Sequence, residues 1–227
     1  MPYSSKHKSQ SRERILNSAL RLFSEGGFEL VTINMVMSNA GLTRGAFYAH
    51  FSSKEDLYAE AIHHGINSSA LVTIPPDDDG LRSLRQLIGT YLSRAHVDGE
   101  AAPCPLAFFA TDVGVRDRRV RDTYTAALQS LAGVLGTHAP ARLQAERVLA
   151  MTVLMVGGVA VSSALTDGAL KDRILASCRR SIIEMAETLP PKVGRKQAVR
   201  KSRTRSPHGR KSTPLSARPR QARNQGH

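Results

Sequence analysis

Residues 32–54, TINMVMSNAGLTRGAFYAHFSSK, decide the fold expected for this chain. Thr32 is the expected N-cap of one short helix that ends near Ala40, and a second short helix is expected over residues 44–50. The break between them opens with Gly41, and glycine adopts a positive φ at little steric cost. Two short helices joined by such a turn are typical of a helix-turn-helix.

The polar side chains of the second helix and of the next helix start indicate an anionic partner. Thr43 is expected to cap the second helix, whose free backbone N–H groups then form an anion site. Arg44 lies in its first turn, where a cation opposes the helix dipole by about 0.3–1 kcal/mol, and Lys54 repeats this mismatch. Both cations are favourable where a phosphate backbone lies against them, and Tyr48 and His50 add hydrogen-bonding groups. The alternative is a solvated helical hairpin with incidental charges.

An amphipathic helix is expected before this segment, over residues 10–25. Its apolar side chains recur on one face, and they are Ile15, Leu16, Ala19, Leu20 and Phe23. Gly26-Gly27 is expected to end the helix, because glycine tolerates the left-handed conformation of a C-cap. With the two short helices, this one would form a three-helix domain.

The rest of the chain is also expected to be helical. Two pairs with capping-box spacing, Ser52/Glu55 and Ser53/Asp56, begin a long helix that Pro75-Pro76 should stop. Further apolar periodicity predicts helices at residues 81–97, 105–114, 117–136, 141–166 and 168–189. Because neither a strand pattern nor a repeat is found in the sequence, we predict an all-α protein.

Residues 148–165 contain no charge and reach the minimum length of a membrane span. The stretch also contains Thr152, Gly157 and Gly158, and nothing else in the sequence resembles it. An all-round apolar helix is either buried in protein or in a membrane. We therefore expect a buried or dimer-interface helix, with a membrane span as the alternative.

The positive charge lies at the two ends of the chain. Of 32 Lys and Arg residues, 12 lie in residues 191–227, which contain no Asp or Glu, and the formal net charge of the chain is +13. Such a segment cannot bury enough apolar surface to fold, so residues 190–227 are expected to be a disordered basic tail. It would add sequence-independent DNA affinity, or it would be a solvated tail without effect.

The two cysteines, Cys104 and Cys178, have neither metal-site nor disulfide-framework spacing. A reducing compartment fits this usage. The polar N-terminus lacks the apolar core of a signal peptide. We therefore expect a cytoplasmic protein with no cofactor and no bound metal.

Several motifs together resemble the DNA-binding signature of the TetR/AcrR family of regulators. They are Thr32-Ile33, Ala40-Gly41-Leu42-Thr43-Arg44-Gly45, Phe47-Tyr48, His50-Phe51, Lys54-Glu55 and Leu57, after a first helix that also matches. The resemblance implies a homodimer that binds a palindromic double-stranded DNA operator and is released by an unidentified small molecule. It also implies a protein associated with the bacterial nucleoid and not with a membrane. It divides the chain into a flexible N-terminus (1–9), a helix-turn-helix domain (10–55), a helical ligand-binding and dimerisation domain (56–189) and the tail (190–227).

The resemblance also implies roles for single residues. The side chains expected to contact phosphates are Thr32, Thr43, Tyr48, His50 and Lys54, and those expected to face base edges are Arg44, Gly45 and Ala46. Of the latter three, Arg44 alone suits a bidentate contact with guanine. The sequence departs from the family pattern at Met35, Met37 and Ala49, and Met37 puts the crossing angle of the helices in doubt.

The second domain has no motif of comparable specificity. Residues that combine apolar bulk with polar tips near the expected pocket are Tyr91, His96, Cys104, Phe108 and Phe109, and ordinary core packing is the alternative for each. A helix start at Pro105 could lower the pKa of Cys104 and make it a thiol sensor. The last two helices resemble those that pair across the family's dimer as a four-helix bundle.

The favoured function is a repressor that a small molecule releases from DNA, and not an enzyme. A transcriptional activator, or a thiol-based redox or electrophile sensor, could use the same DNA-binding head. A hydrolytic enzyme with Cys104 as nucleophile and His96 as base is a remote alternative, because the sequence indicates no third orienting group.

Overall fold

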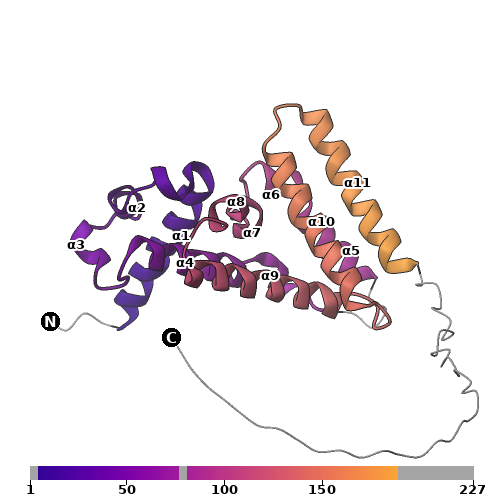
Figure 1. The fold of residues 1–227 in the computed structure, drawn as a ribbon, viewed down its shortest axis with the longest axis horizontal. Helices are drawn as coiled ribbons and strands as arrows, with labels where there is room; N and C mark the ends of the chain where they lie inside the picture. Colours follow the sequence, from indigo (N-terminus) through magenta and orange to yellow (C-terminus); the bar gives the residue numbers. More distant parts are fainter. Residues whose placement is uncertain (1–4, 77–80, 189–227) are drawn as a thin grey trace, which may run out of the picture. The chain divides into compact units, whose positions relative to one another are not determined.

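The computed structural model describes residues 5–76 and 81–188, and these residues form helices and connecting turns (Figure 1). The helices are α1 (Ser5–Leu30), α2 (Ile33–Asn39), α3 (Arg44–Phe47), α4 (Lys54–Asn67), the short 3-10 helix η1 (Ala70–Thr73), α5 (Arg82–Tyr91), α6 (Arg94–Val97), α7 (Pro105–Phe108), α8 (Ala110–Val113), α9 (Arg118–His138), α10 (Ala145–Ser163) and α11 (Gly168–Glu187). The all-α prediction is confirmed. The predicted basic tail, 190–227, lies outside the described residues.

The first three helices pack on α4 around aromatic side chains. The predicted apolar face of α1 is buried, and Phe23 contacts Phe28, Tyr58 and Phe109 through their rings. The helix begins at Ser5 rather than at residue 10, because neither proline nor glycine interrupts the polar residues before it. It also continues beyond the predicted end, with a break at Gly27, where φ is +70°.

Several predicted helices are shorter or divided. α4 ends at Asn67, well before the prolines that were expected to stop it, and the Ser69 hydroxyl then caps η1. The predicted helix 81–97 is interrupted after Leu92, since the Ser93 hydroxyl accepts a hydrogen bond from the His96 N–H at 3.2 Å and starts α6. The predicted helix 105–114 is divided at Phe109 into α7 and α8.

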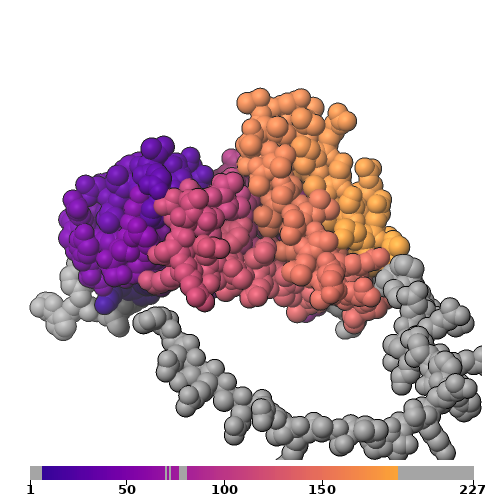
Figure 2. Space-filling view, in the orientation of Figure 1, coloured from indigo at the N-terminus to yellow at the C-terminus, as the bar shows by residue number. Residues whose placement is uncertain are grey.

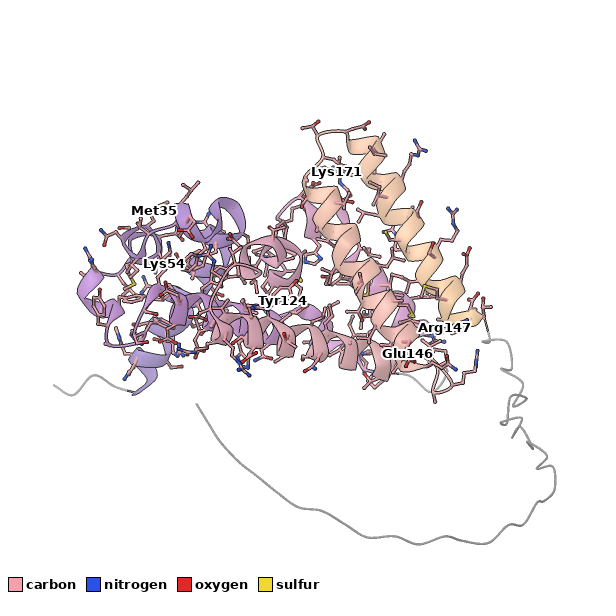
Figure 3. All side chains as sticks on the ribbon, in the orientation of Figure 1. Met35, Lys54, Tyr124, Glu146, Arg147 and Lys171 are labelled. Carbon is pink, nitrogen blue, oxygen red and sulfur yellow. The ribbon has the colours of Figure 1, made fainter. Side chains whose placement is uncertain are left out.

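The apolar helix α10 packs against α9 and α11. Gly158 permits close approach, because a Cβ there would lie 2.9 Å from Leu92 Cδ2 and 3.0 Å from Cys178 Sγ. Near the start of α10, Arg147 donates from Nη1 to the carbonyl oxygen of Met185 at 2.9 Å (Figure 3). At the other end of α11, Lys171 donates to Asp98 at 3.0 Å. The first contact links α10 to α11, and the second links α11 to the residue that follows α6.

One face of α10 is buried and the other is exposed. Within the described residues, α10 is the one helix long and apolar enough to cross a membrane. Its buried side chains, which include Met151, Met155 and Val159, belong to the hydrophobic core of the described residues. On the opposite face, Val153 is 61% exposed and Val161 is 53% exposed. A core helix therefore presents an apolar surface, which belongs to the orange region of Figure 2.

Candidate nucleic-acid interface and cavity

The turn between α2 and α3 has the geometry of a glycine C-cap. Thr32 caps α2, and its hydroxyl accepts a hydrogen bond from the Met35 N–H at 3.2 Å. At the other end, Gly41 has φ of +65°, and the Leu42 N–H donates to the Met37 carbonyl oxygen at 2.9 Å. This is a Schellman motif, so the chain leaves α2 in a fixed direction. Met37 is buried between the helices.

Two side chains of α1 that the sequence analysis did not single out hold α2 in place. Arg14 donates from Nη2 to the carbonyl oxygen of Ala40 at 2.6 Å, and the Ser18 hydroxyl donates to that of Val36 at 2.9 Å. A Cβ at Gly41 would lie 2.7 Å from Arg14 Nη2. Glycine is therefore favoured there by its positive φ, and a Cβ would also displace the guanidinium from its present position.

α3 presents the predicted base-contacting residues to solvent around one buried anchor. Phe47 is fully buried, whereas Arg44, Gly45 and Tyr48 are exposed, and Tyr48 is 61% exposed. Ala46 is half-buried and packs against the core. α3 is shorter than predicted, because hydrogen bonds between residues three apart tighten the chain after Phe47.

The capping role predicted for Thr43 is wrong. Thr43 occupies the N-cap position of α3, but its hydroxyl makes no capping hydrogen bond. Its carbonyl oxygen accepts from the Ala46 N–H at 3.1 Å instead. The side chain is exposed beside Arg44, so its hydroxyl is accessible to a phosphate.

His50 is half-buried beside two cations. Burial lowers the pKa of its imidazole, and the positive charges of Lys8 and Arg12 lower it further. Its Nδ1 is buried without a hydrogen-bond partner in the part of the chain that the structure describes. The ring is therefore neutral at physiological pH and lies where an added negative charge would strongly favour its protonated form.

Lys54 does not extend freely from the start of α4. Its ammonium lies 4.2 Å from the centre of the Phe28 ring and 3.5 Å from the carbonyl oxygen of Glu29 (Figure 3). Burial lowers the pKa of Lys54 more than the neighbouring Glu29 raises it. The preceding residue, Ser53, caps α4, because its hydroxyl accepts a hydrogen bond from the Asp56 N–H at 3.1 Å. This is the contact expected for the predicted Ser53/Asp56 pair. The contact of Lys54 with a phosphate stays a prediction.

A junction of four residues, Phe28, Glu29, Asp112 and Arg116, connects the end of α1 to α8 and the loop after it. Asp112 accepts a hydrogen bond from the Phe28 N–H at 2.6 Å, and Arg116 pairs with Glu29 at 2.7 Å. The Arg116 guanidinium also lies 4.4 Å from the centre of the Phe28 ring. The junction thus connects α1 to α8 and the loop after it through charged groups and one aromatic ring.

A cavity of about 160 Å³ lies among α4, η1, α5, α6, α9 and the loop that precedes α7. It brings together three of the five predicted ligand-binding residues, Tyr91, His96 and Cys104. Phe108 lines a different, more open depression, which Leu20 also lines. Phe109 is fully buried, and its ring stacks on Tyr58 at 4.7 Å between centroids. Neither phenylalanine therefore lines this cavity, and their role in ligand binding stays a prediction.

The polar groups of the cavity are engaged with one another. The Tyr91 hydroxyl lies 3.0 Å from Cys104 Sγ, and His96 Nδ1 donates to the Tyr91 carbonyl oxygen at 2.6 Å. Burial raises the pKa of Cys104, which contradicts the lowered pKa expected at a helix start. A buried thiol with a raised pKa is a poor nucleophile, so the structure does not favour Cys104 as a sensor or catalytic residue.

Comparisons with known proteins agree on one family. The family model of the N-terminal domain of bacterial regulatory proteins of the tetR family matches residues 15–61. The chain is 45% identical over 51 residues to the HTH-type transcriptional regulator AcrR of Shigella flexneri, which is 22% of this chain and 24% of that protein. It is 42% identical over 50 residues to the HTH-type transcriptional repressor AcnR of Corynebacterium diphtheriae, which is 22% of this chain and 26% of that protein.

The fold extends this agreement beyond the N-terminal domain. The matches to the two regulators span about a quarter of their lengths. The structure of a TetR-family transcriptional regulator from Agrobacterium tumefaciens superposes with a TM-score of 0.64 at 20% identity, and the match covers 79% of this chain and 98% of that one. The N-terminal segment thus matches the tetR family of bacterial regulatory proteins, and the all-helical fold of the described residues is that of TetR-family regulators.

Proposed function

We propose that this chain is a homodimeric DNA-binding regulator, a repressor that a small molecule releases from a palindromic operator. Residues 10–55 are its DNA-binding domain, and residues 56–189 bind the effector and form the dimer. The observation that carries the proposal is the exposed face of α3, where Arg44, Gly45 and Tyr48 surround the buried Phe47. One similar protein, AcnR of Corynebacterium diphtheriae, is a transcriptional repressor, which supports the proposed sign of regulation.

On DNA, α3 would enter the major groove. Arg44 would donate to a guanine, and Gly45 would let the backbone come close to the bases. Thr32, Thr43, Tyr48, His50 and Lys54 would contact phosphates, and Ala46 would touch a base edge only with its exposed part. The arrangement separates base recognition by Arg44 from positioning by the other groups.

The exposed face of α10 would form the dimer interface. One side of the helix carries three exposed apolar side chains, Leu149, Val153 and Val161. On the same side, no neighbouring heavy atom lies within 4 Å of the position that a Cβ of Gly157 would take. Spacings of four and eight residues bring side chains to one face of a helix. Pairing this face and α11 with their copies would bury the apolar surface and set the two α3 helices one turn of DNA apart, about 34–36 Å.

The cavity would be the effector site, because one segment connects it to the junction. Pro103 and Cys104 line the cavity, and eight residues further along the chain Asp112 binds the Phe28 N–H. A ligand that favours another position of α7 and α8 would shift the junction, and with it the DNA-binding domain. The two DNA-binding domains of the dimer would then no longer fit the two half-sites of the operator at the same time.

The test is selection of bound duplexes from random DNA, followed by affinity measurements on the selected operator and its point variants. Arg44→Ala should relax base preference at one position of each half-site, at a cost of about 1–3 kcal/mol. Tyr48→Phe should weaken binding about equally for all sequences. Arg121→Ala, at an exposed position of α9, is the matched control and should change neither. Unaltered operator affinity in both α3 variants would overturn the proposed docking.

A further inference from the structure

The size of the cavity limits what it can hold. At about 160 Å³ it is close to the volume, about 150 Å³, of an apolar protein cavity that holds one benzene molecule. Sites for drug-sized ligands are larger, about 300–1,000 Å³. The cavity therefore has room for one six-membered ring with a small substituent.

The lining of the cavity excludes an ionic ligand. Its apolar side chains include Ile66, Leu71, Leu131 and Val134. Among its described lining residues there is no Asp, Glu, Lys or Arg. A charged molecule would leave water without gaining a counter-charge, which is strongly unfavourable.

The tautomer of His96 is fixed by its backbone contact. The side chain is 9% exposed, and a carbonyl oxygen can only accept, so Nδ1 must carry the hydrogen that it shares with Tyr91 at 2.6 Å. Burial lowers the pKa of His96, which keeps the ring neutral. In the neutral ring Nε2 is then an acceptor, and it has no protein partner within the described residues.

The other polar groups of the buried wall do not compete for a ligand in the same way. The Tyr91 hydroxyl and the Cys104 thiol lie 3.0 Å apart and satisfy each other. Asn67 and Ser130 are exposed, so water reaches them. The Ser69 hydroxyl, which also lines the cavity, already accepts from the Leu71 N–H at 3.3 Å. Nε2 of His96 is thus the acceptor that a bound molecule would have to satisfy.

From size, lining and tautomer together, we propose that the cavity binds an uncharged, mainly apolar molecule of about one ring, with a single hydroxyl or N–H group that donates to His96 Nε2. A phenol is the simplest member of this class. The inference rests on the proposed function only in making this molecule the effector, since binding itself can be measured without DNA.

The test is calorimetric titration of the full chain with phenol, toluene and benzoate. Phenol should bind tightest, and toluene about tenfold more weakly, because it fills the same space without the hydrogen bond. Benzoate should show no binding, because its carboxylate would be buried without a partner. Equal binding of phenol and toluene would overturn the role of Nε2, and preference for benzoate, or no binding by any probe, would overturn the ligand class.

A substitution separates the hydrogen bond from the shape of the site. His96→Phe should abolish the preference for phenol while toluene still binds, and retained toluene binding shows that the variant is folded. His7→Phe, at an exposed histidine of α1, is the matched control and should keep the preference. A preference for phenol that survives in His96→Phe would contradict the proposal.

The effector role is tested separately on the selected operator. Phenol should raise the dissociation constant for DNA in the wild-type protein and not in His96→Phe. If phenol binds but DNA affinity does not change, the effector role is wrong and the ligand class stands. If the ligand-free protein selects no DNA sequence at all, the proposed function fails, whatever the calorimetry shows.

Discussion

The crossing of α1 and α2 depends on individual side chains rather than on the apolar pattern alone. Arg14 and Ser18 donate to carbonyl oxygens near the end of α2, at Ala40 and Val36. A helix end leaves its last carbonyls, such as that of Ala40, without intrahelical partners, so the guanidinium takes the place of water there. The Val36 carbonyl oxygen accepts from Ser18 in addition to the Ala40 N–H. Met37, whose size raised doubt about the crossing angle, is accommodated with 1% exposure.

His50 should make DNA binding depend on pH. Its pKa is lowered in the free protein by burial and by Lys8 and Arg12, and a phosphate beside the ring would raise it. Between the two pKa values binding takes up a proton, so operator affinity should increase as pH falls. The slope should reach at most about a hundredfold per pH unit for the dimer, because one proton is linked in each of its two protomers. Affinity measured between about pH 8 and pH 6 checks this.

Substitution identifies the group responsible. His50→Gln keeps a hydrogen-bonding side chain that does not titrate, so its affinity should change less with pH than that of the wild type. His63→Gln changes an exposed histidine of α4 and should retain the full dependence. Identical pH profiles for wild type and His50→Gln would show that His50 does not contact a phosphate.

At the scale of elements, periodicity located the long helices but not the breaks between short ones. α9, α10 and α11 lie within a few residues of their predicted ranges. The break after Leu92 was missed, because the apolar spacing continues through Ser93, whose hydroxyl starts a new helix. A local hydrogen bond of this kind competes with helix continuation without changing the apolar pattern.

The candidate site was predictable where it is local in sequence. The exposure of Arg44 and Tyr48 around a buried Phe47 follows from spacing within one short helix. The bond from the Phe28 N–H to Asp112 joins residues 84 positions apart, and no periodicity encodes such a contact. Tertiary packing decides it, as it also decides that Phe109 lies in the core.

Asp112→Ala should loosen the attachment of α1 to α8. It removes the charged acceptor of the half-buried Phe28 N–H and a neighbour of Arg116, so the free energy of unfolding should fall by about 1–3 kcal/mol. Hydrogen exchange at the Phe28 amide should accelerate, and operator affinity should decrease. Denaturant unfolding and exchange measured by NMR check both effects.

An exposed carboxylate of α9 provides the comparison. Asp122 pairs with Arg118 at 3.5 Å, and both side chains are largely exposed. Asp122→Ala should therefore change the free energy of unfolding by less than about 1 kcal/mol and leave the Phe28 amide unaffected. Equal destabilisation by the two substitutions would contradict the role of the junction.

At the scale of the whole molecule, charge at the C-terminal end should add to DNA affinity. Residues 191–227 lie outside the described part of the chain, and their 12 cations and lack of acids are known from the sequence. Each phosphate neutralised contributes about −0.9 to the slope of log affinity against log salt. Deletion of residues 191–227 should flatten this slope for operator and random DNA alike. An unchanged slope would show that these residues do not add to DNA affinity.

The apolar face of α10 should decide the oligomeric state, and through it the affinity for a palindrome. Val153→Glu places a carboxylate on a surface that a second copy would cover, and burying an unpaired charge costs several kcal/mol. The dimer dissociation constant should rise about 100-fold or more, with a matching loss of operator affinity, because a single α3 reads only one half-site. Val115→Glu, at a valine that is 75% exposed between α8 and α9, adds the same charge elsewhere and should leave the dimer intact. If sedimentation measurements find both variants to be dimers of equal stability, the dimer interface does not lie on this face of α10.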